Sequence, residues 1–106
     1  MTYMFYKLND DKSISPCSWK DLKEWTKQFI TGSNLLHLDK LNDYTISTIW
    51  TGIDHCSGPP NRALFLFETV IFSPEHTCLY CMKHTNFEEA KSGHKNALQL
   101  VKNNYL

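Results

Sequence analysis

The chain has 106 residues, of which 42% are hydrophobic, and its eleven basic and eleven acidic side chains give zero net charge. This length and composition predict a single folded domain over residues 1–106, and the charge balance excludes a non-specific nucleic-acid binder, which needs a basic face. No stretch approaches the roughly 20 apolar residues that cross a bilayer, and the first residues lack the pattern of a signal peptide. We therefore expect a cytoplasmic protein without a membrane segment.

The first third of the chain predicts a strand, a loop and a helix. Thr2–Leu8 is aromatic and alternates weakly, as in a strand, and residues 9–16 carry Asn, Asp and Ser-Pro turn signals. The next segment has apolar residues at helical spacing: Trp19, Leu22, Trp25, Phe29 and Ile30. This spacing predicts an amphipathic helix that begins after Ser18 and ends at Gly32.

Four further segments predict strands. Asn34–Lys40 is a short candidate, and Tyr44–Asp54 is rich in threonine, isoleucine and aromatic residues. Arg62–Phe72 is apolar at both alternating positions, which is typical of a strand covered on both faces. The Ser-Gly-Pro-Pro sequence between these two segments predicts that they pair as a hairpin. Cys78–Lys83 predicts one more, shorter strand.

The last segment predicts a helix. Thr85 and Glu88 have the spacing of a capping box. The apolar positions that follow form one helical stripe: Phe87, Ala90, His94, Leu98, Val101 and Tyr105. The element order β-α-β-β-β-β-α predicts an α+β fold, with an antiparallel sheet of four to five strands and two helices packed on one face.

Glu68 is the first candidate functional residue, because it is the one acid in the most apolar strand. A buried carboxylate is costly unless another group pairs with it. His94 lies within the apolar stripe of the last helix, and the adjacent Gly93 favours close contact between helix and strand. The sequence thus predicts a contact between Glu68 and His94, with His55 nearby, either as a structural pair, a recognition site or an acid–base catalytic site.

Two further groups of residues are candidates. The stretch around His84 contains Cys78 and Cys81, whose side chains suit zinc, but two residues three apart in a strand point to opposite faces. We therefore expect reduced thiols and no metal or other cofactor. Trp50 and Tyr44 share one side of their predicted strand and could form a binding surface or a homodimer contact if that face is open. The candidate binding residues are Trp50, Tyr44, Asp54, Thr48 and Thr69.

Short motifs are spread along most of the chain: Ser15-Pro-Cys17, Trp25, Ile46-Ser-Thr48, Gly52-Ile-Asp-His55, Pro59-Pro60, Phe67-Glu-Thr69, Phe72, Glu88-Glu-Ala90 and Gly93-His94. Together they resemble a family of small tailed-phage proteins of unknown function. The resemblance implies a phage origin and a location in the host cytoplasm, and it supplies no chemistry.

These observations favour a small phage accessory protein that acts by binding. The expected partner is a host protein, such as a CRISPR or other defence component that the protein would antagonise, or else a small signalling ligand. The alternative is a small hydrolase or nuclease that uses Glu68, His94 and His55. The sequence leaves open whether the protein is an enzyme.

Overall fold

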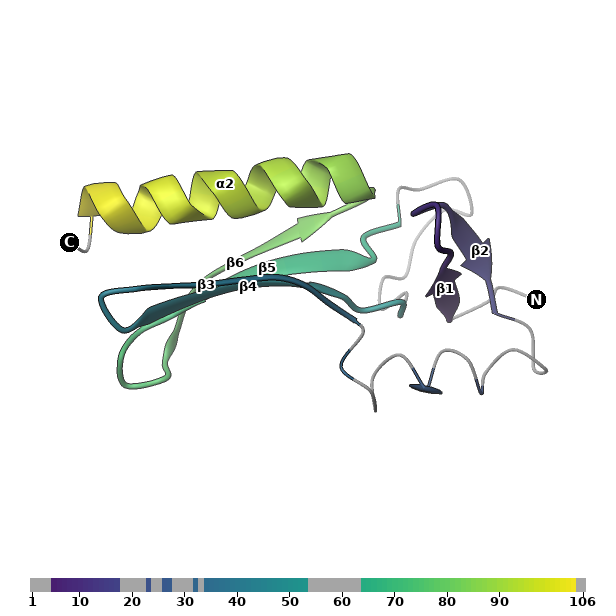
Figure 1. Cartoon of the computed structure of the whole chain (residues 1–106), viewed down its shortest axis with the longest axis horizontal. Coiled ribbons are helices and arrows are strands. Elements are labelled where there is room, and N and C mark those ends of the chain that lie inside the picture. Colours follow the sequence, from purple (N-terminus) through teal and green to yellow (C-terminus); the bar gives the residue numbers. More distant parts are fainter. Residues whose placement is uncertain are drawn as a thin grey trace.

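The structure is a computed structural model that describes residues 5–17, 23, 26–27, 32, 34–53 and 64–104. The elements within this part are β1 (Tyr6–Leu8), β2 (Ile14–Pro16), β3 (Leu35–Leu41), β4 (Tyr44–Trp50), β5 (Phe67–Phe72), β6 (Cys78–His84) and α2 (Phe87–Asn104). Strands β3 to β6 form an antiparallel sheet in the order β3-β4-β5-β6, and β1 and β2 form a separate antiparallel pair. Helix α2 lies along one face of the four-stranded sheet (Figure 1).

The α+β class and the four-stranded antiparallel sheet confirm the coarse prediction, but the two predicted helices are not matched. The helix whose bounds the structure gives is α2, and the helix predicted to end at Gly32 falls largely outside the described residues. The predicted first strand does not join the main sheet. It pairs instead with β2, a strand within the segment that was predicted to be a loop.

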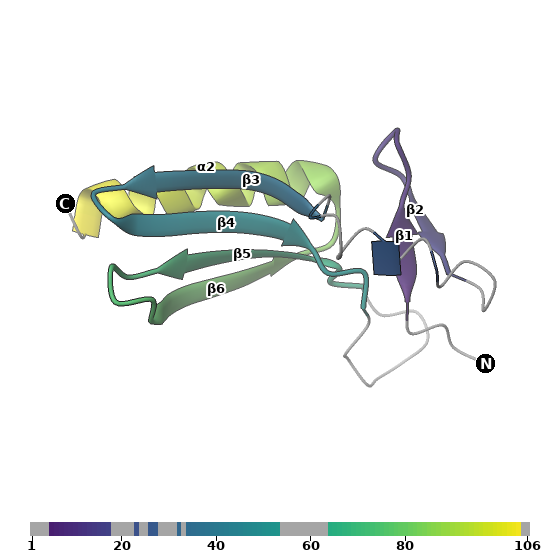
Figure 2. The same ribbon diagram turned by 60° about the horizontal axis from the view of Figure 1, so that its bottom comes forward.

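The β3–β4 connection is a two-residue turn, which sets the register of the first hairpin. Asn42 and Asp43 both have positive φ, 52° and 72°, and Leu41 pairs with Tyr44. Two positive φ values are typical of a type I′ turn, whose twist matches that of the flanking strands, and Asn and Asp tolerate this conformation. Figure 2 shows the resulting sheet from its broad side, with the four strands next to one another and α2 behind them.

The predicted pairing of the second and third central strands is confirmed, since β4 and β5 are antiparallel neighbours. Their register places Thr48 opposite Thr69. Because side chains alternate along a strand, this register turns the even-numbered residues of β4 and the odd-numbered residues of β5 toward α2. The remaining residues of both strands lie on the opposite face, which we call the open face.

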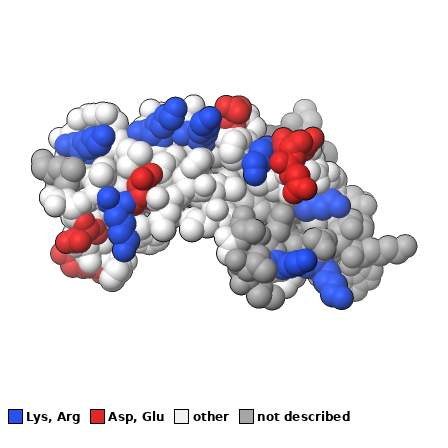
Figure 3. All heavy atoms as spheres, in the orientation of Figure 1, with Lys and Arg blue, Asp and Glu red and all other residues white. Residues whose placement is uncertain are grey.

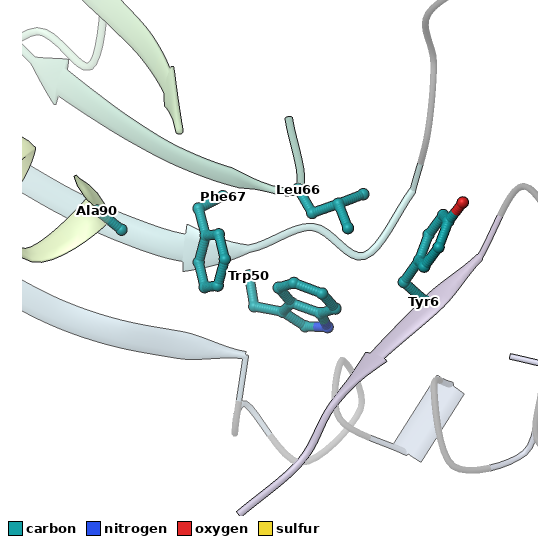
Figure 4. Close-up of a cluster of buried hydrophobic side chains, with 5 residues drawn as sticks. All are labelled: Tyr6, Trp50, Leu66, Phe67 and Ala90. Carbon is teal, nitrogen blue, oxygen red and sulfur yellow. The ribbon is translucent and has the colours of Figure 1, made fainter. Parts of the chain in front are cut away.

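Two apolar clusters form the core on the helix-facing side of the sheet, and the first also includes a residue of β1. The first consists of Tyr6, Trp50, Leu66, Phe67 and Ala90 (Figure 4), and the second of Ile46, Ile71, Ala97 and Val101. Within the first cluster the rings of Trp50 and Phe67 meet edge to face at 4.9 Å. Along β4, β5 and α2 alike, the residues between the clusters are polar: Thr48, Thr69 and His94. A polar layer thus separates two halves of the core.

The burial of Trp50 corrects the prediction of an aromatic binding surface. Its side chain is 0% exposed, and Tyr44, on the same side of β4, packs against the second cluster. The prediction is wrong because this side of β4 faces the helix and not the open face.

Start of helix α2

Asn86 caps α2, one residue later than the predicted capping box. Its side-chain oxygen accepts a hydrogen bond from the backbone N–H of Glu89 at 2.8 Å. The Glu89 carboxylate reaches back and accepts hydrogen bonds from the backbone N–H and the hydroxyl of Thr85, at 2.9 and 2.5 Å. The bond to Asn86 satisfies one of the free N–H groups at the start of the helix, and the bonds between Thr85 and Glu89 hold the end of β6 close to the first turn of α2.

Candidate functional site

Five polar side chains form a continuous chain of hydrogen bonds across the polar layer, which we call the polar chain. It begins at Asp39 on β3, whose Oδ2 accepts a hydrogen bond from Nε2 of His94 at 2.8 Å. Nδ1 of His94 lies 2.8 Å from Oγ1 of Thr48, which in turn lies 2.7 Å from Oγ1 of Thr69. The chain ends at Nε2 of His84 on β6, 2.9 Å from the Thr69 hydroxyl. It therefore links all four strands of the sheet to α2.

Strand register and one glycine bring these groups together. Thr48 and Thr69 are direct cross-strand partners, a pairing in which two threonine hydroxyls can reach each other. His84 pairs with Phe67 at the edge of the sheet, and its ring lies under Gly93. A Cβ atom built on Gly93 would come within 2.2 Å of Cε1 of that ring. The sequence-based expectation that this glycine marks a close approach of helix and strand is confirmed.

The polar chain is most exposed at its Asp39 end. Thr48 and Thr69 are fully buried, His84 and His94 are 4% and 5% exposed, and the side chain of Asp39 is 50% exposed. A carboxylate, an imidazole and a hydroxyl in sequence are also the parts of a nucleophilic triad. Here, however, the hydroxyl of Thr48 is sealed between sheet and helix, so a substrate cannot reach it. The geometry fits a group that holds the helix on the sheet.

The His84 end of the polar chain meets a shallow groove between β6 and the first half of α2. The groove has a volume of about 770 Å³, and its walls include Phe65, His84, Glu88, Ser92, Gly93 and Asn96. Burial lowers the pKa of His84, and the nearby Glu89 carboxylate opposes this shift. His84 is therefore held toward its neutral form.

His37 lies beside the polar chain without joining it. The centroid of its ring is 5.2 Å from that of His94 and 6.3 Å from that of Phe87. Its Nε2 atom is buried and has no hydrogen-bond partner among the described residues. Burial, followed by the charges of His94 and Lys91, lowers the pKa of His37, and Asp39 acts in the opposite direction. An unsatisfied polar atom of this kind weakens the fold.

The predicted contact between Glu68 and His94 is wrong, because the two residues lie on opposite faces of the sheet. Thr69 takes the position that faces α2, so the adjacent Glu68 points to the open face. There its Oε1 accepts a hydrogen bond from the thiol of Cys81 at 3.0 Å. The other residues of the predicted sites, His55 and Asp54, lie outside the described residues.

The cysteine–histidine stretch does not converge on one point. Cys81 is on the open face, whereas His84 is on the helix side of the same strand, so they cannot share an ion. Within the described ranges, no three His, Cys, Asp or Glu side chains are placed to hold a metal. Cys78 and Cys81 are exposed free thiols. Although Cys81 is exposed, partial desolvation of its thiol raises the pKa to about 11, with further contributions from its hydrogen bond to Glu68 and from the charge of that carboxylate.

Sequence reasoning missed Asp39 and His37 and assigned His84 only to a weak metal site. A usable signal was present in His37-Leu38-Asp39, where two polar residues two apart in a strand must share a face. Thr48 and Thr69 were predicted as binding residues, and the structure places both in the polar chain.

The open face carries exposed apolar side chains. Leu35 and Leu38 on β3 are 43% and 52% exposed. Ladder register places Leu35 beside Ile49 and aligns Leu38 with Ser47, Val70 and Cys81 across the sheet. Helix α2 contacts all four strands of the sheet and covers the other face, and Tyr6 of β1 joins the apolar cluster on that same side.

Comparisons with protein-family models, with curated proteins and with solved structures find no match to this chain. No helix in the described part of the chain is long and apolar enough to span a membrane.

Proposed function

We propose that the protein acts by binding another protein through the open face of its four-stranded sheet. The observation that carries this proposal is the exposure of Leu35 and Leu38 on the face that α2 does not cover. Exposed apolar side chains grouped on one surface are typical of protein–protein interaction sites.

The arrangement of charges on the open face supports a protein partner. Ladder register places Lys40 at one end of the face and the neighbours Glu68 and Lys83 at the other, with Leu38 and Val70 in the row between them. An apolar centre with charged groups around it is the usual composition of a specific interface. Lys91, Lys95 and Lys102 are exposed on α2, which covers the other face. Figure 3 shows basic side chains along the side of the molecule where α2 lies.

The burial of the polar chain argues against the hydrolase or nuclease alternative. That reading requires Glu68 beside His94 in a site that a substrate can enter. Glu68 is on the open face, and His94 is enclosed beneath α2. That the partner belongs to an infected host, and that it is a defence component, rests on the phage resemblance alone.

The proposal is tested by comparing capture of partner proteins by the wild type with capture by two variants. Leu38→Glu places a charge in the middle of the open face, and Gln99→Glu places the same charge on the exposed side of α2. A protein captured by the wild type is identified by mass spectrometry, purified, and titrated against all three forms by calorimetry. We expect Gln99→Glu to bind like the wild type and Leu38→Glu to bind at least tenfold more weakly.

Three results would overturn this proposal. Leu38→Glu could bind as tightly as the wild type, which would place the interface elsewhere. Sedimentation could show that the wild type forms a dimer that Leu38→Glu abolishes, in which case the open face binds a second copy. The third is a small molecule that co-purifies with both variants, which would locate binding in a pocket instead.

A further inference from the structure

The polar chain contains fewer hydroxyl protons than hydrogen bonds. Three hydrogen bonds connect His84, Thr69, Thr48 and His94, and each threonine hydroxyl has one proton to donate. The third proton must therefore come from a ring nitrogen of one histidine, and the facing ring nitrogen of the other histidine must be bare and accept. The two histidines consequently have opposite roles whenever the chain is intact.

Asp39 holds a proton on Nε2 of His94, so the charge state of His94 determines which histidine donates to the threonines. The Asp39 carboxylate only accepts, so Nε2 of His94 carries a proton. When His94 is neutral, its Nδ1 is bare and accepts from Thr48, Thr48 accepts from Thr69, and Thr69 accepts from Nε2–H of His84. When His94 is charged, its Nδ1–H donates to Thr48, both hydroxyls reverse, and Nε2 of His84 must be bare.

We propose that the polar chain is a proton relay in which protonation of His94 reverses both threonine hydroxyls and moves the ring proton of His84 from Nε2 to Nδ1. The atoms balance as follows. A proton from water binds Nδ1 of His84, the Nε2 proton of His84 passes to Thr69, the Thr69 proton passes to Thr48, and the Thr48 proton passes to Nδ1 of His94. The net change is one added proton, whose positive charge rests on His94.

The geometry around the two rings supports this final position. His94 lies 2.8 Å from the Asp39 carboxylate, and burial disfavours a charge on His84. His37, on which Lys91 also acts, faces the His94 ring, and positive charges on these two rings oppose each other, while Glu89 near His84 favours a charge on that ring. The residues that β4 and β5 contribute to the polar chain, Thr48 and Thr69, are uncharged. The direct contact with Asp39 is the closest of these interactions.

The relay limits the number of protons that the two histidines can add, and it passes the effect of a proton from the Asp39 end to the His84 end. With the chain intact, a charged His94 requires a neutral His84, so the pair holds at most one extra proton. Nδ1 of His84 is a hydrogen-bond acceptor in one state and a donor in the other. Because His84 lines the groove beside α2, protonation at the Asp39 end changes which ligand atoms that groove wall can bind. This inference does not depend on the proposed function of the open face.

The test is a pH titration of the protein labelled with ¹⁵N in its histidine rings, since ring-nitrogen shifts identify each tautomer. In the wild type, we expect His84 to change from the Nε2–H to the Nδ1–H tautomer at the same pH at which His94 gains a proton. Thr48→Val removes one hydroxyl and should uncouple the two events, whereas Thr48→Ser should preserve the coupling. Thr45→Val, on the open face of the same strand, is the matched control and should behave like the wild type.

Asp39→Asn provides a second test at a half-exposed position, where a folding defect is not expected. Loss of the carboxylate should move the tautomer change of His84 to a different pH. The relay is excluded if His84 keeps one tautomer throughout the titration, if both rings become charged together, or if Asp39→Asn leaves the behaviour of His84 unchanged.

Discussion

The backbone of Gly93 lies directly over the imidazole ring of His84. A Cβ atom at position 93 would approach Cε1 and Nε2 of that ring to 2.2 and 2.6 Å, distances that real side chains do not adopt. His84 cannot move aside freely, because its Nε2 is held by Thr69 and the residue is 4% exposed. The spacing between β6 and α2 therefore depends on the absence of a side chain at one helix position.

Gly93→Ala should destabilise the protein, although alanine is the better helix former. Alanine improves helix propensity by about 1 kcal/mol, but the clash with His84 has the cost of an overpacked core, about 1–3 kcal/mol. Urea unfolding should show a lower free energy of unfolding than the wild type. Ser92→Ala, at the adjacent exposed position, should show no loss. A Gly93→Ala protein more stable than the wild type would contradict the observed packing.

The two threonines of the polar chain should behave as one energetic unit. Thr48→Val and Thr69→Val each leave buried partners without a hydrogen bond, and each should lower the free energy of unfolding by about 1–3 kcal/mol. The double variant should lose less than the sum of the two, because the bond between the hydroxyls is lost in either case. A double-mutant cycle in denaturant measures the coupling. Strictly additive losses would mean that the two hydroxyls do not interact.

Acidification should destabilise the protein before its carboxylates titrate. The pKa values of His37 and His84 are lowered from 6.5, so below about pH 6.5 the unfolded state binds protons that the folded state does not. By linkage, the free energy of unfolding must fall as the pH decreases through this range and level off once the folded-state histidines are also protonated. The lowered pKa values of Asp11 and Glu89 act in the same direction at lower pH, below their ordinary values of 3.8 and 4.5.

His37→Leu should reduce this acid sensitivity and raise stability at neutral pH. The variant removes one of the two histidines and also the buried Nε2 atom that lacks a partner, for a gain of about 1 kcal/mol. Urea titrations at pH 7.5 and 5.5 compare the variant with Gln99→Leu, an exposed substitution that should keep the full wild-type decrease. An equal decrease in both variants would exclude His37 as a source of the pH dependence.

Cys81 should react slowly with alkylating reagents. The thiolate is the reactive form, and a pKa near 11 in place of 9.0 reduces its population about 100-fold at a given pH, because each pKa unit is a factor of ten. Glu68→Gln removes the negative charge and should accelerate the reaction several-fold, although burial, the largest cause of the shift, remains. Peptide mass spectrometry after timed exposure to iodoacetamide measures the rate at each cysteine. Equal rates in wild type and variant would show that Glu68 does not act on Cys81.

The sequence predicted the main sheet because its signals are local. The β-branched and aromatic segments around Ile46 and Val70 indicate β4 and β5 through their composition, and the stripe through Ala90 and Val101 indicates α2. The separate β1–β2 pair could not be predicted in the same way, because three-residue strands carry little alternation and the Asn9–Pro16 segment has the composition of a loop.

The site was predicted in part, and the error has a definite physical cause. β5 is apolar at both alternating positions, so its sequence does not show which side faces the helix, and Glu68 was placed on the wrong side. His94 was identified from its position in an apolar stripe, and Gly93 was identified because glycine has a low propensity for the interior of a helix. Their true partners, Asp39 and His84, lie on the two edge strands, and only the strand order brings those edges to one helix.

The polar chain also constrains how the sequence can change over generations. With Thr48, Thr69, His84 and His94 all buried and mutually bonded, a single replacement leaves its neighbours with unmet bonding capacity. A homologous protein without this arrangement must therefore differ at several of these positions at once, and we expect apolar side chains in their place. Homologous sequences, aligned at these four positions, should have either all four residues or none of them.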